Sequence, residues 1–392
     1  MSSEAPATGA ATRAPRRDLL SSALARTIGL LGAFLLAGLL GSIIILAYGE
    51  NPLDVYRIVF EFSFNRPQDI ASVLENATPL IFSGLAVAVA FKAGLFNIGV
   101  EGQYIVAMAA AAAAALGLSF LPGFLLVPAV LIAAMLGGMV WASVPAVLKV
   151  KTGAHEVVTT IMMNGIAISL VAWLILNPMR STAGQMIDLR TDLLPKKSLI
   201  PTIAETLGIE SIPGSVYFTW LFPLALVACF LVWVLLFRTR LGYEVRAVGS
   251  SSGSAEAGGI STGATQIKIF LISGALAGFV GLNHLLGDKG YLGSNYEILL
   301  GFNGITVAFL GRNHPAGIPL AAILIGMLSR GQDGIAVLTD LPTEILIILQ
   351  GVLILSVVIA YELVSRRITR RRQQEVRAEE EPPSARPAEA TA

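Results

Sequence analysis

Long windows without a charged residue divide the chain. The first runs from Thr27 to Tyr48, and the others cover residues 102–148, 157–179, 211–237, 269–287 and 345–361. An α-helix needs about 20 apolar residues to cross a bilayer, so the longest window has room for two spans. The windows are apolar on both faces, whereas a strand of a membrane barrel alternates with a period of two. The pattern predicts an all-α, polytopic membrane helix bundle.

About ten membrane spans follow from this pattern, and some of them are short. One domain over residues 27–364 would hold them, with an external loop at 178–217 and a cytoplasmic loop at 238–266. Residues 1–26 and 365–392 have the composition of disordered cytoplasmic tails. Five spans before the external loop and five after it, in opposite orientation, predict an inverted repeat with some broken helices. The spans are expected at residues 27–48, 71–91, 101–117, 122–148, 156–177, 218–237, 267–287, 298–311, 316–329 and 342–363, which leaves 49–70 as a further loop.

The basic residues predict the orientation of the chain. With both termini in the cytoplasm, most Lys and Arg residues fall on the cytoplasmic side, as the positive-inside rule requires. The window from Thr27 to Tyr48 exceeds the apolar core of a signal peptide, about 7 to 15 residues, so we interpret it as a retained anchor. Composition agrees, since 55% of the residues are hydrophobic and only 14% are charged. We expect a multi-pass protein of a bacterial inner membrane.

Several kinds of chemistry find no support in the residues. The formal net charge of +1 argues against binding nucleic acid, and the single cysteine, Cys229, cannot build a disulfide framework or a cysteine metal cluster. The three histidines lack metal-ligand spacing. No Gly-Lys-Ser/Thr is present, so the chain has no phosphate-cradling loop. We expect no catalytic residues, no metal and no cofactor, and energy supplied by another protein.

An interruption lies between the second and third expected spans, from Lys92 to Gln103. It contains three glycines together with Asn97 and Glu101. Broken backbone at membrane depth survives only where protein or a water-filled cavity satisfies the freed amides. The segment is therefore a candidate lining of a translocation path; the alternative is an ordinary cytoplasmic turn between two helices.

A second interruption runs from Gly301 to Pro315 and includes Asn303. Pro315 disfavours helical geometry at His314, so Arg312 to His314 are expected to form a cytoplasmic turn. Amides offer both donors and acceptors to a polar solute, but they also hold membrane helices together. The candidate path residues are Asn97, Glu101, Gln103, Asn164, Asn283 and Asn303.

The cytoplasmic loop from Arg238 to Ile260 combines glycines, serines and a few charges. Small polar residues before Ser254 and glycine after it predict a short helix over Ser254 to Gly258, which could dock into another protein. The alternative is a plain re-entry loop that carries positive-inside arginines. The candidate docking residues are Glu244, Arg246, Gly249, Ala255, Glu256, Gly258 and Gly259.

Four motifs in order resemble the permeases of bacterial ABC importers, in particular the nucleoside-type branch of the branched-chain amino acid and ribose permease group. They begin at Gly94 (Gly-Leu-Phe-Asn-Ile-Gly-Val-Glu-Gly-Gln), at His155 (His-Glu-Val-Val-Thr-Thr-Ile-Met-Met-Asn), at Arg246 (Arg-Ala-Val-Gly) and at Gly311 (Gly-Arg-Asn-His-Pro). The resemblance implies two permease subunits around one path, expected here as a heterodimer, two cytoplasmic ATPases, and an external lipid-anchored or periplasmic binding protein. It also implies a coupling helix within residues 241–260, although Ser250 to Ser254 depart from the Asn and Pro that relatives tend to carry there.

Three classes of function remain open, namely an ABC permease, a secondary transporter or channel, and a membrane-embedded enzyme. A proton- or sodium-coupled carrier usually needs acids inside its spans. Apart from Glu101 and Glu156, both expected near the cytoplasmic face, the span interiors are expected to lack acids, and this favours the ABC permease. The choice of a nucleoside as the small polar solute rests on the resemblance alone, followed by ribose-type sugars and then branched-chain amino acids.

Overall fold

The computed structural model describes residues 32, 34–181, 189–214, 216–339, 341–342, 344–345, 347–357 and 359–360. The described residues fall into two compact units, one within residues 50–347 and one that holds the described residues before 50 and after 347. Helices over Phe34–Ala47 and Ile347–Val357 account for most of the described part of the second unit. The expected tails at 1–26 and 365–392 lie outside the described residues.

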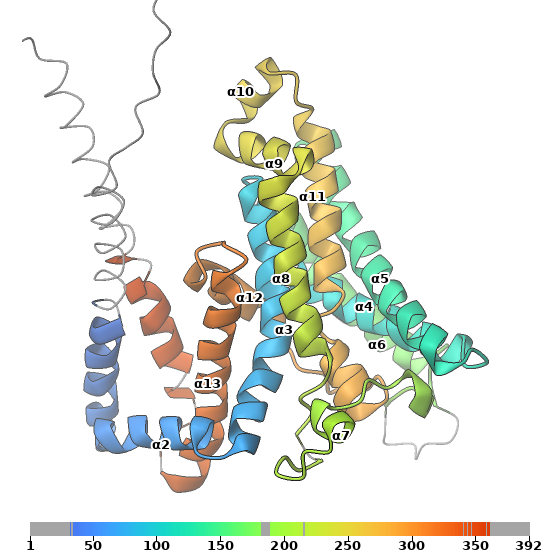
Figure 1. Ribbon diagram of the computed structural model, residues 1–392. Helices are drawn as coiled ribbons and strands as arrows, with labels where there is room; N and C mark the ends of the chain where they lie inside the picture. The colour runs from blue at the N-terminus through green and yellow to red at the C-terminus, as the bar shows by residue number, and fades with distance from the viewer. Residues whose placement is uncertain are drawn as a thin grey trace, which may run out of the picture. The chain divides into compact units, whose positions relative to one another are not determined.

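The larger unit is built from helices, most of which are joined by short turns (Figure 1). Its described residues contain isolated backbone bridges rather than strands. The elements are α2 Pro52–Phe64, α3 Pro67–Lys92, α4 Val100–Gly117, α5 Gly123–Thr152, α6 Glu156–Leu176, η1 Lys196–Ser198, α7 Ile203–Leu207, α8 Leu221–Arg238, α9 Arg240–Ser250, α10 Ser252–Ala257, α11 Thr262–Ala277, η2 Asn283–Lys289, α12 Leu300–Leu310 and α13 Gly317–Leu338.

The all-α membrane class predicted from the uncharged windows is confirmed. Six described helices, α3, α4, α5, α6, α8 and α13, are long and apolar enough to cross a membrane by length and composition. The helix α12 is shorter and apolar, as expected for a short span. The total of about ten spans and the inverted repeat stay predictions.

The prediction of a loop over residues 49–70 is wrong, because most of this stretch is helical. The side chain of Asn51 accepts a hydrogen bond from the backbone N–H of Leu53, and Pro52 opens α2 at its first position. Charged residues along α2 conceal its apolar side in the sequence. That side packs on α13, where Gly331 and Gly334 leave room for Val59 and Phe62.

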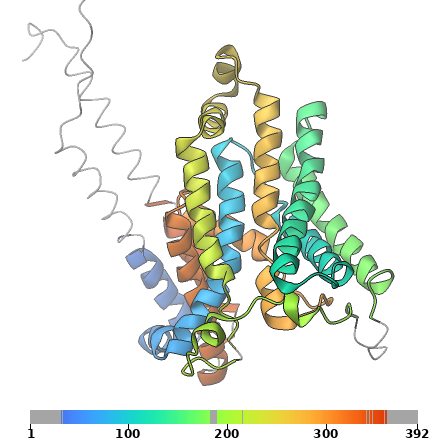
Figure 2. The same cartoon turned by 45° about the vertical axis from the view of Figure 1, so that its right-hand side comes forward.

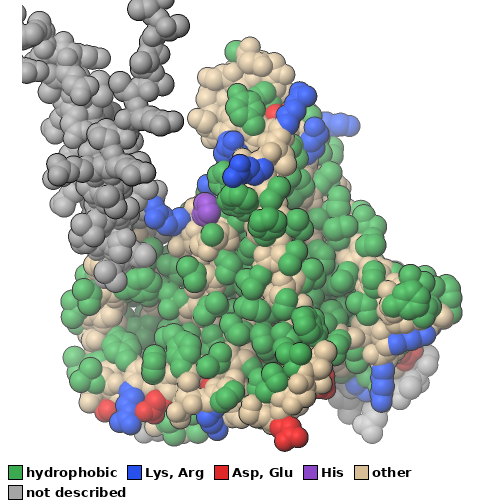
Figure 3. Space-filling model, viewed as in Figure 1, with side chains coloured by type: hydrophobic (Ala, Val, Ile, Leu, Met, Phe, Trp, Pro, Cys, Tyr) green, Lys and Arg blue, Asp and Glu red, His purple; other side chains and the backbone are tan. Residues whose placement is uncertain are grey.

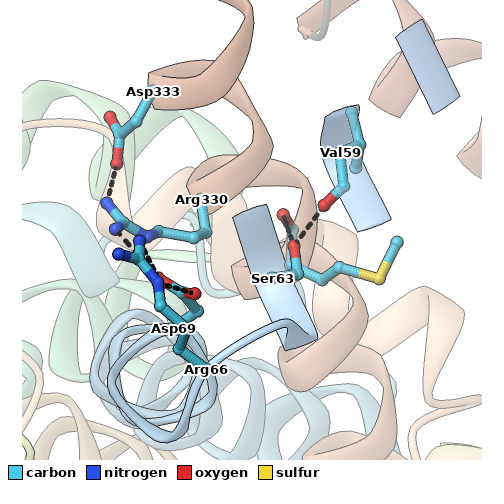
Figure 4. A network of polar contacts seen from close by, with 7 residues as sticks. Val59, Ser63, Arg66, Asp69, Arg330 and Asp333 are labelled. Carbon is cyan, nitrogen blue, oxygen red and sulfur yellow. Dashed lines mark hydrogen bonds and ion pairs between the residues drawn. The ribbon is translucent and has the colours of Figure 1, made fainter. Parts of the chain in front are cut away.

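The expected span over 316–329 also ends too early, since α13 continues through charged residues to Leu338. Figure 4 shows the reason. The guanidinium of Arg330 lies 3.5 Å from Asp69 and 2.6 Å from Asp333, and Asp69 also accepts a hydrogen bond from Arg66. The Asp69 side chain is only 1% exposed, and a buried carboxylate is stable only when it is paired. These ion pairs join α13 to the start of α3.

The central helix of this unit is α3. Every residue from Ala77 to Ala90 is buried, as expected for a helix that is apolar on all sides and surrounded by others. Figure 2 shows α3 between α8 and α11, with α5 beyond α11. Small residues allow the close approach: a Cβ atom on Gly274 would lie 2.5 Å from the carbonyl oxygen of Gly138 on α5. Such packing is typical of membrane helices.

The two ends of this unit differ in their elements and charges. The last residues of α3, α5 and α8 and the first residues of α11 meet near α9 and α10, whereas α2 and α7 lie at the opposite end (Figure 1). Figure 3 shows Lys and Arg side chains gathered around α9 and α10, above the apolar surface of α8. We refer to these as the α9–α10 end and the α7 end. The cytoplasmic orientation of the α9–α10 end stays a prediction.

Candidate functional site

A polar pocket of about 340 Å³ lies between α3, η2, α12 and α13. Its size falls within the range of about 300 to 1,000 Å³ that is usual for small-molecule sites. Most of the lining is polar, in contrast to the apolar helices around it. The lining residues are Glu75, Asn76, Pro79, Leu80, Val280, Asn283, His284, Asp288, Glu297, Ile298, Leu300, Asn303 and Ser329.

One wall of the pocket is the π-helical turn η2, which contributes Asn283, His284 and Asp288. The expected continuous span over 267–287 is wrong here, because α11 ends at Ala277. A Cβ atom on Gly278 would lie 2.5 Å from the carbonyl oxygen of Ala134, so α5 presses directly on the backbone where the helix breaks. Such π-helical turns often occur at functional sites, because they redirect side chains that a regular helix would point elsewhere.

Three carboxylates from different elements line the pocket. Glu75 comes from α3, and its Oε2 accepts a hydrogen bond of 3.1 Å from the backbone N–H of Tyr217. Asp288 lies 2.8 Å from the ammonium of Lys289 and 3.7 Å from Nδ1 of His284. The hydrogen bond to Asp288 is the main cause of the raised pKa of Lys289. Glu297 precedes α12.

The sequence pattern predicts acids inside the spans only at Glu101 and Glu156. This prediction is wrong, because Glu75 lies within α3. The signal was present: Glu75 lies inside the expected span 71–91, six residues after Asp69, in a helix whose later residues carry no charge before Lys92. An intramembrane acid is a functional candidate by default.

Two of the six candidate path residues, Asn283 and Asn303, line the pocket. The Oδ1 of Asn283 accepts a hydrogen bond of 2.7 Å from the hydroxyl of Thr219. Thr219 and Tyr217 belong to the segment that connects α7 with α8, so this connection fixes groups on two walls. Before α7, the backbone N–H of Ile200, between η1 and α7, donates to the carbonyl of Leu286 in η2.

Three other candidates, Asn97, Gln103 and Asn164, form a buried network. Asn97 is 1% exposed and makes four hydrogen bonds: its Nδ2 donates to Gln103 and to Ser273, and its Oδ1 accepts from Gln103 and from the backbone of Gly99. Asn164 accepts from the backbone N–H of Gly102 and donates to the carbonyl of Ile98. These amides join α6 and α11 to the interruption between α3 and α4. A role in the path stays a prediction for all three.

Glu101 binds the beginning of α12. Its carboxylate accepts hydrogen bonds from the backbone N–H groups of Leu299 at 2.7 Å and Gly301 at 2.8 Å. Tyr104 lies 3.0 Å from the same carboxylate. Glu101 is 3% exposed, and nearby Ser83, nine residues before the end of α3, donates to the carbonyl of Leu300. Glu101 therefore lies inside the bundle and connects the two interruptions, rather than near a face as expected.

The loop at 238–266 folds into two helices, α9 and α10. The predicted short helix is confirmed as α10, which Ser251 caps through its bond to the N–H of Ser254 and which Gly258 follows as the C-cap. A groove of about 380 Å³ lies beside it. Three of the seven candidate docking residues line the groove, namely Glu244, Gly258 and Gly259, together with Arg240, Tyr243, Ile260, Ser261, Ala264, Thr265 and Lys268.

The other four docking candidates lie around this groove without lining it. Glu256 is exposed on α10, and Ala255 beside it is buried. The guanidinium of Arg246 lies 5.5 Å from the ring centre of Phe237, which holds α9 against α8. A Cβ atom on Gly249 would clash with the carbonyl oxygen of Lys92, so α9 touches the chain that leaves α3. Docking by any of these residues stays a prediction.

No group of three or more His, Cys, Asp and Glu residues that could hold a metal ion occurs in the described part of the chain. The expectation of no metal and no cofactor stays a prediction. The pocket offers hydrogen-bond acceptors and donors, and the groove at the other end is open to a partner. The arrangement suits the binding of a polar solute.

Comparison with known proteins places this arrangement in a family. The family described as "Branched-chain amino acid transport system / permease component" matches residues 70–358. A glucose ABC transporter permease of Haloferax volcanii is 32% identical over 80% of this chain and 82% of its own length. A guanosine permease of Bacillus subtilis is 32% identical over 82% and 90%, and a nucleoside permease of Lactococcus lactis is 31% identical over 82% and 88%. The chain therefore belongs to the permease-component family of branched-chain amino acid transport systems.

Proposed function

We propose that the chain is the membrane subunit of an ATP-driven importer of nucleosides. The observation that carries the proposal is the polar pocket inside an apolar bundle. Two relatives at 31% and 32% identity are named as nucleoside and guanosine permeases, which supports this solute. The ATPase is a separate protein in this proposal, because the chain has no phosphate-cradling loop.

The chemistry of the pocket favours a neutral solute rich in hydroxyl groups. Carboxylates such as Glu75 and Glu297 accept hydrogen bonds from ribose hydroxyls, and the amides of Asn76 and Asn303 can pair with the edge of a base. The same carboxylates repel the carboxylate of an amino acid, which disfavours branched-chain amino acids. A sugar is the second candidate, because it shares the hydroxyl chemistry and one relative is named as a glucose permease.

Two ends of the larger unit suit two kinds of partner. We assign the groove beside α10 to the ATPase, with Glu244, Gly258 and Gly259 in its wall, and we place this end in the cytoplasm. The binding protein would then face the α7 end. The second permease subunit of the complex is proposed to be a different chain. Co-purification of a homodimer that transports solute with the ATPase alone would contradict that last point.

The solute is tested with the complex that co-purifies with this chain, reconstituted in liposomes. Uptake of guanosine, ribose, glucose and leucine is compared under the same conditions. We expect ATP-dependent uptake of guanosine above that of the others. Preferred uptake of a sugar would favour the second candidate as the solute. ATP hydrolysis by this chain alone would contradict the assignment of hydrolysis to a separate protein.

The docking groove is tested by filling it. Gly258 is exposed, and a Cβ atom on it would lie no closer than 3.4 Å to its neighbours, so Gly258→Trp should leave abundance and membrane insertion intact. We expect it to abolish uptake. The matched control for abundance and membrane insertion is Gly214→Trp, at an exposed glycine far from the groove with open space around it. Normal uptake in Gly258→Trp would refute docking at the groove.

A further inference from the structure

Residues 93–101 form a short segment that begins beneath the loop of α9 and α10. The backbone of Gly249 lies against this segment where it leaves α3: an added Cβ atom would clash with the carbonyl oxygen of Lys92 and would lie 3.1 Å from the backbone nitrogen of Gly94. Gly94 itself has a φ of +71°, which favours glycine. The two backbones are in direct contact, so a displacement of α9 along this direction must move the segment.

The middle of the segment is held in place by buried hydrogen bonds. Asn97 uses both amide hydrogens and its carbonyl oxygen in hydrogen bonds, and its partner Ser273 donates in turn to the carbonyl of Ala86 on α3. Asn164 holds the backbone on the far side through Gly102 and Ile98. A buried polar network in which every group is hydrogen-bonded is rigid, because any shift leaves a donor or an acceptor unpaired where water cannot reach it. The segment therefore moves as one piece.

The segment ends at the wall of the pocket. Glu101 holds the N–H groups of Leu299 and Gly301, and Leu299 has a φ of +72°, an uncommon conformation for a residue with a side chain. The carboxylate thus fixes the strained turn from which α12 begins. Four residues around this turn, Glu297, Ile298, Leu300 and Asn303, line the pocket.

We infer that Glu101 is a positioning residue of the solute pocket, and that residues 93–101 connect it to α9, so that a displacement of α9 at Gly249 alters the pocket wall. The inference rests on the proposed function, because it assigns the groove to the ATPase and the pocket to the solute. It adds the element by which the two sites affect each other. Two sites are coupled when binding at either one changes the position of the same element, and this segment contacts both sites.

The connection is tested with a reporter in the pocket wall of the intact co-purified complex. The only cysteine, Cys229, is buried on α8 and is replaced by alanine, and Asn303→Cys introduces a new thiol. Its rate of reaction with a water-soluble methanethiosulfonate is measured with and without a non-hydrolysable ATP analogue. We expect the analogue to change this rate by about threefold or more, on the scale of typical coupling between sites.

Two glycine variants then separate the connection from general damage. Gly249→Ala pushes α9 away from Lys92, and we expect it to abolish the nucleotide effect on the reporter. Gly253→Ala places the same methyl group in open space in the same loop, and we expect the effect to persist. A nucleotide effect that survives Gly249→Ala, that is lost in Gly253→Ala, or that is absent without either change would overturn the inference.

Glu101 is tested without the reporter. Glu101→Gln turns an amide group towards the N–H of Leu299 or Gly301, and we expect the KM for guanosine to rise about tenfold while the maximal rate of uptake changes less. Glu101→Asp keeps both oxygens and should recover part of the loss. A fall by the same factor in the maximal rate of uptake and in the basal ATPase rate, without a change in KM, would indicate a merely structural role and overturn the assignment. If guanosine is not transported at all, the solute proposal fails, while the thiol measurement still decides the connection.

Discussion

The side chains of Asn97 and Asn303 carry the same amide and lie in the same bundle of helices, yet their surroundings differ. Asn97 is 1% exposed and makes four hydrogen bonds within the protein. Asn303 is partly exposed and faces a pocket of about 340 Å³. A polar group held by protein partners contributes to the stability of the fold, whereas one that faces open space is available to a solute. Residue type alone does not separate the two roles.

The largest expected effect separates the network from the pocket by stability. Asn97→Leu leaves Gln103, Ser273 and the N–H of Gly99 without their partner in a buried site. Each such group costs about 1 to 3 kcal/mol, so we expect a loss of about 3 kcal/mol or more in the free energy of unfolding. The measurement is thermal unfolding of the purified protein in detergent.

The matched control for that change is Asn303→Leu at the pocket. Its amide faces open space, so we expect a change of no more than about 0.5 kcal/mol, typical of sites without buried partners. Similar losses in both variants would show that the two amides play the same structural role, and the distinction between network and pocket would fail.

The fold could be predicted from the sequence wherever burial follows from missing charge. The limits of α4 and α6 agree with the expected spans 101–117 and 156–177 to within one residue, because the membrane excludes unpaired charge. The prediction failed where charges are paired, as in α13, whose Arg330 is matched by Asp69 from a distant part of the chain. Pairing is a three-dimensional property that a linear pattern does not contain.

The candidate site was predictable only in part, for the same reason. The interruption at 92–103 was recognised from its glycines and polar residues, but whether it lines a path or ties helices together depends on Ser273 and Asn164, which are distant in sequence. Glu75 lies in an unbroken helix, so a pattern of helix interruptions does not mark it. Asn283 and Asn303 were named as candidates, and the structure brings them to one pocket.

The second prediction tests the pocket from its acidic side. Glu75→Gln keeps the shape but replaces one acceptor oxygen with an NH2 donor, and a solute hydroxyl that loses its acceptor in a partly buried site costs about 1 to 3 kcal/mol. We expect the KM for guanosine uptake to rise about tenfold with no change in the melting temperature. Glu61→Gln on exposed α2 is the control and should alter neither quantity. An unchanged KM in Glu75→Gln would remove this carboxylate from the solute site.

The smallest expected effect comes from a residue that shares features of the buried network and of the pocket lining. Asn283 lines the pocket, but it is 8% exposed and its Oδ1 is held at 2.7 Å by the hydroxyl of Thr219. Thr219→Val removes that hydroxyl and keeps the shape. The amide then loses its fixed orientation, one buried acceptor loses its donor, and the backbone N–H of Leu221 loses an acceptor at 3.3 Å. We expect a loss of about 1 kcal/mol in stability together with a rise of about threefold in the KM for guanosine, because an oriented amide binds better than a free one. Thr219→Ser keeps the hydroxyl and should restore the KM. A stability loss without any change in KM would place Asn283 with the buried network, and a change in KM without a stability loss would place it wholly with the pocket.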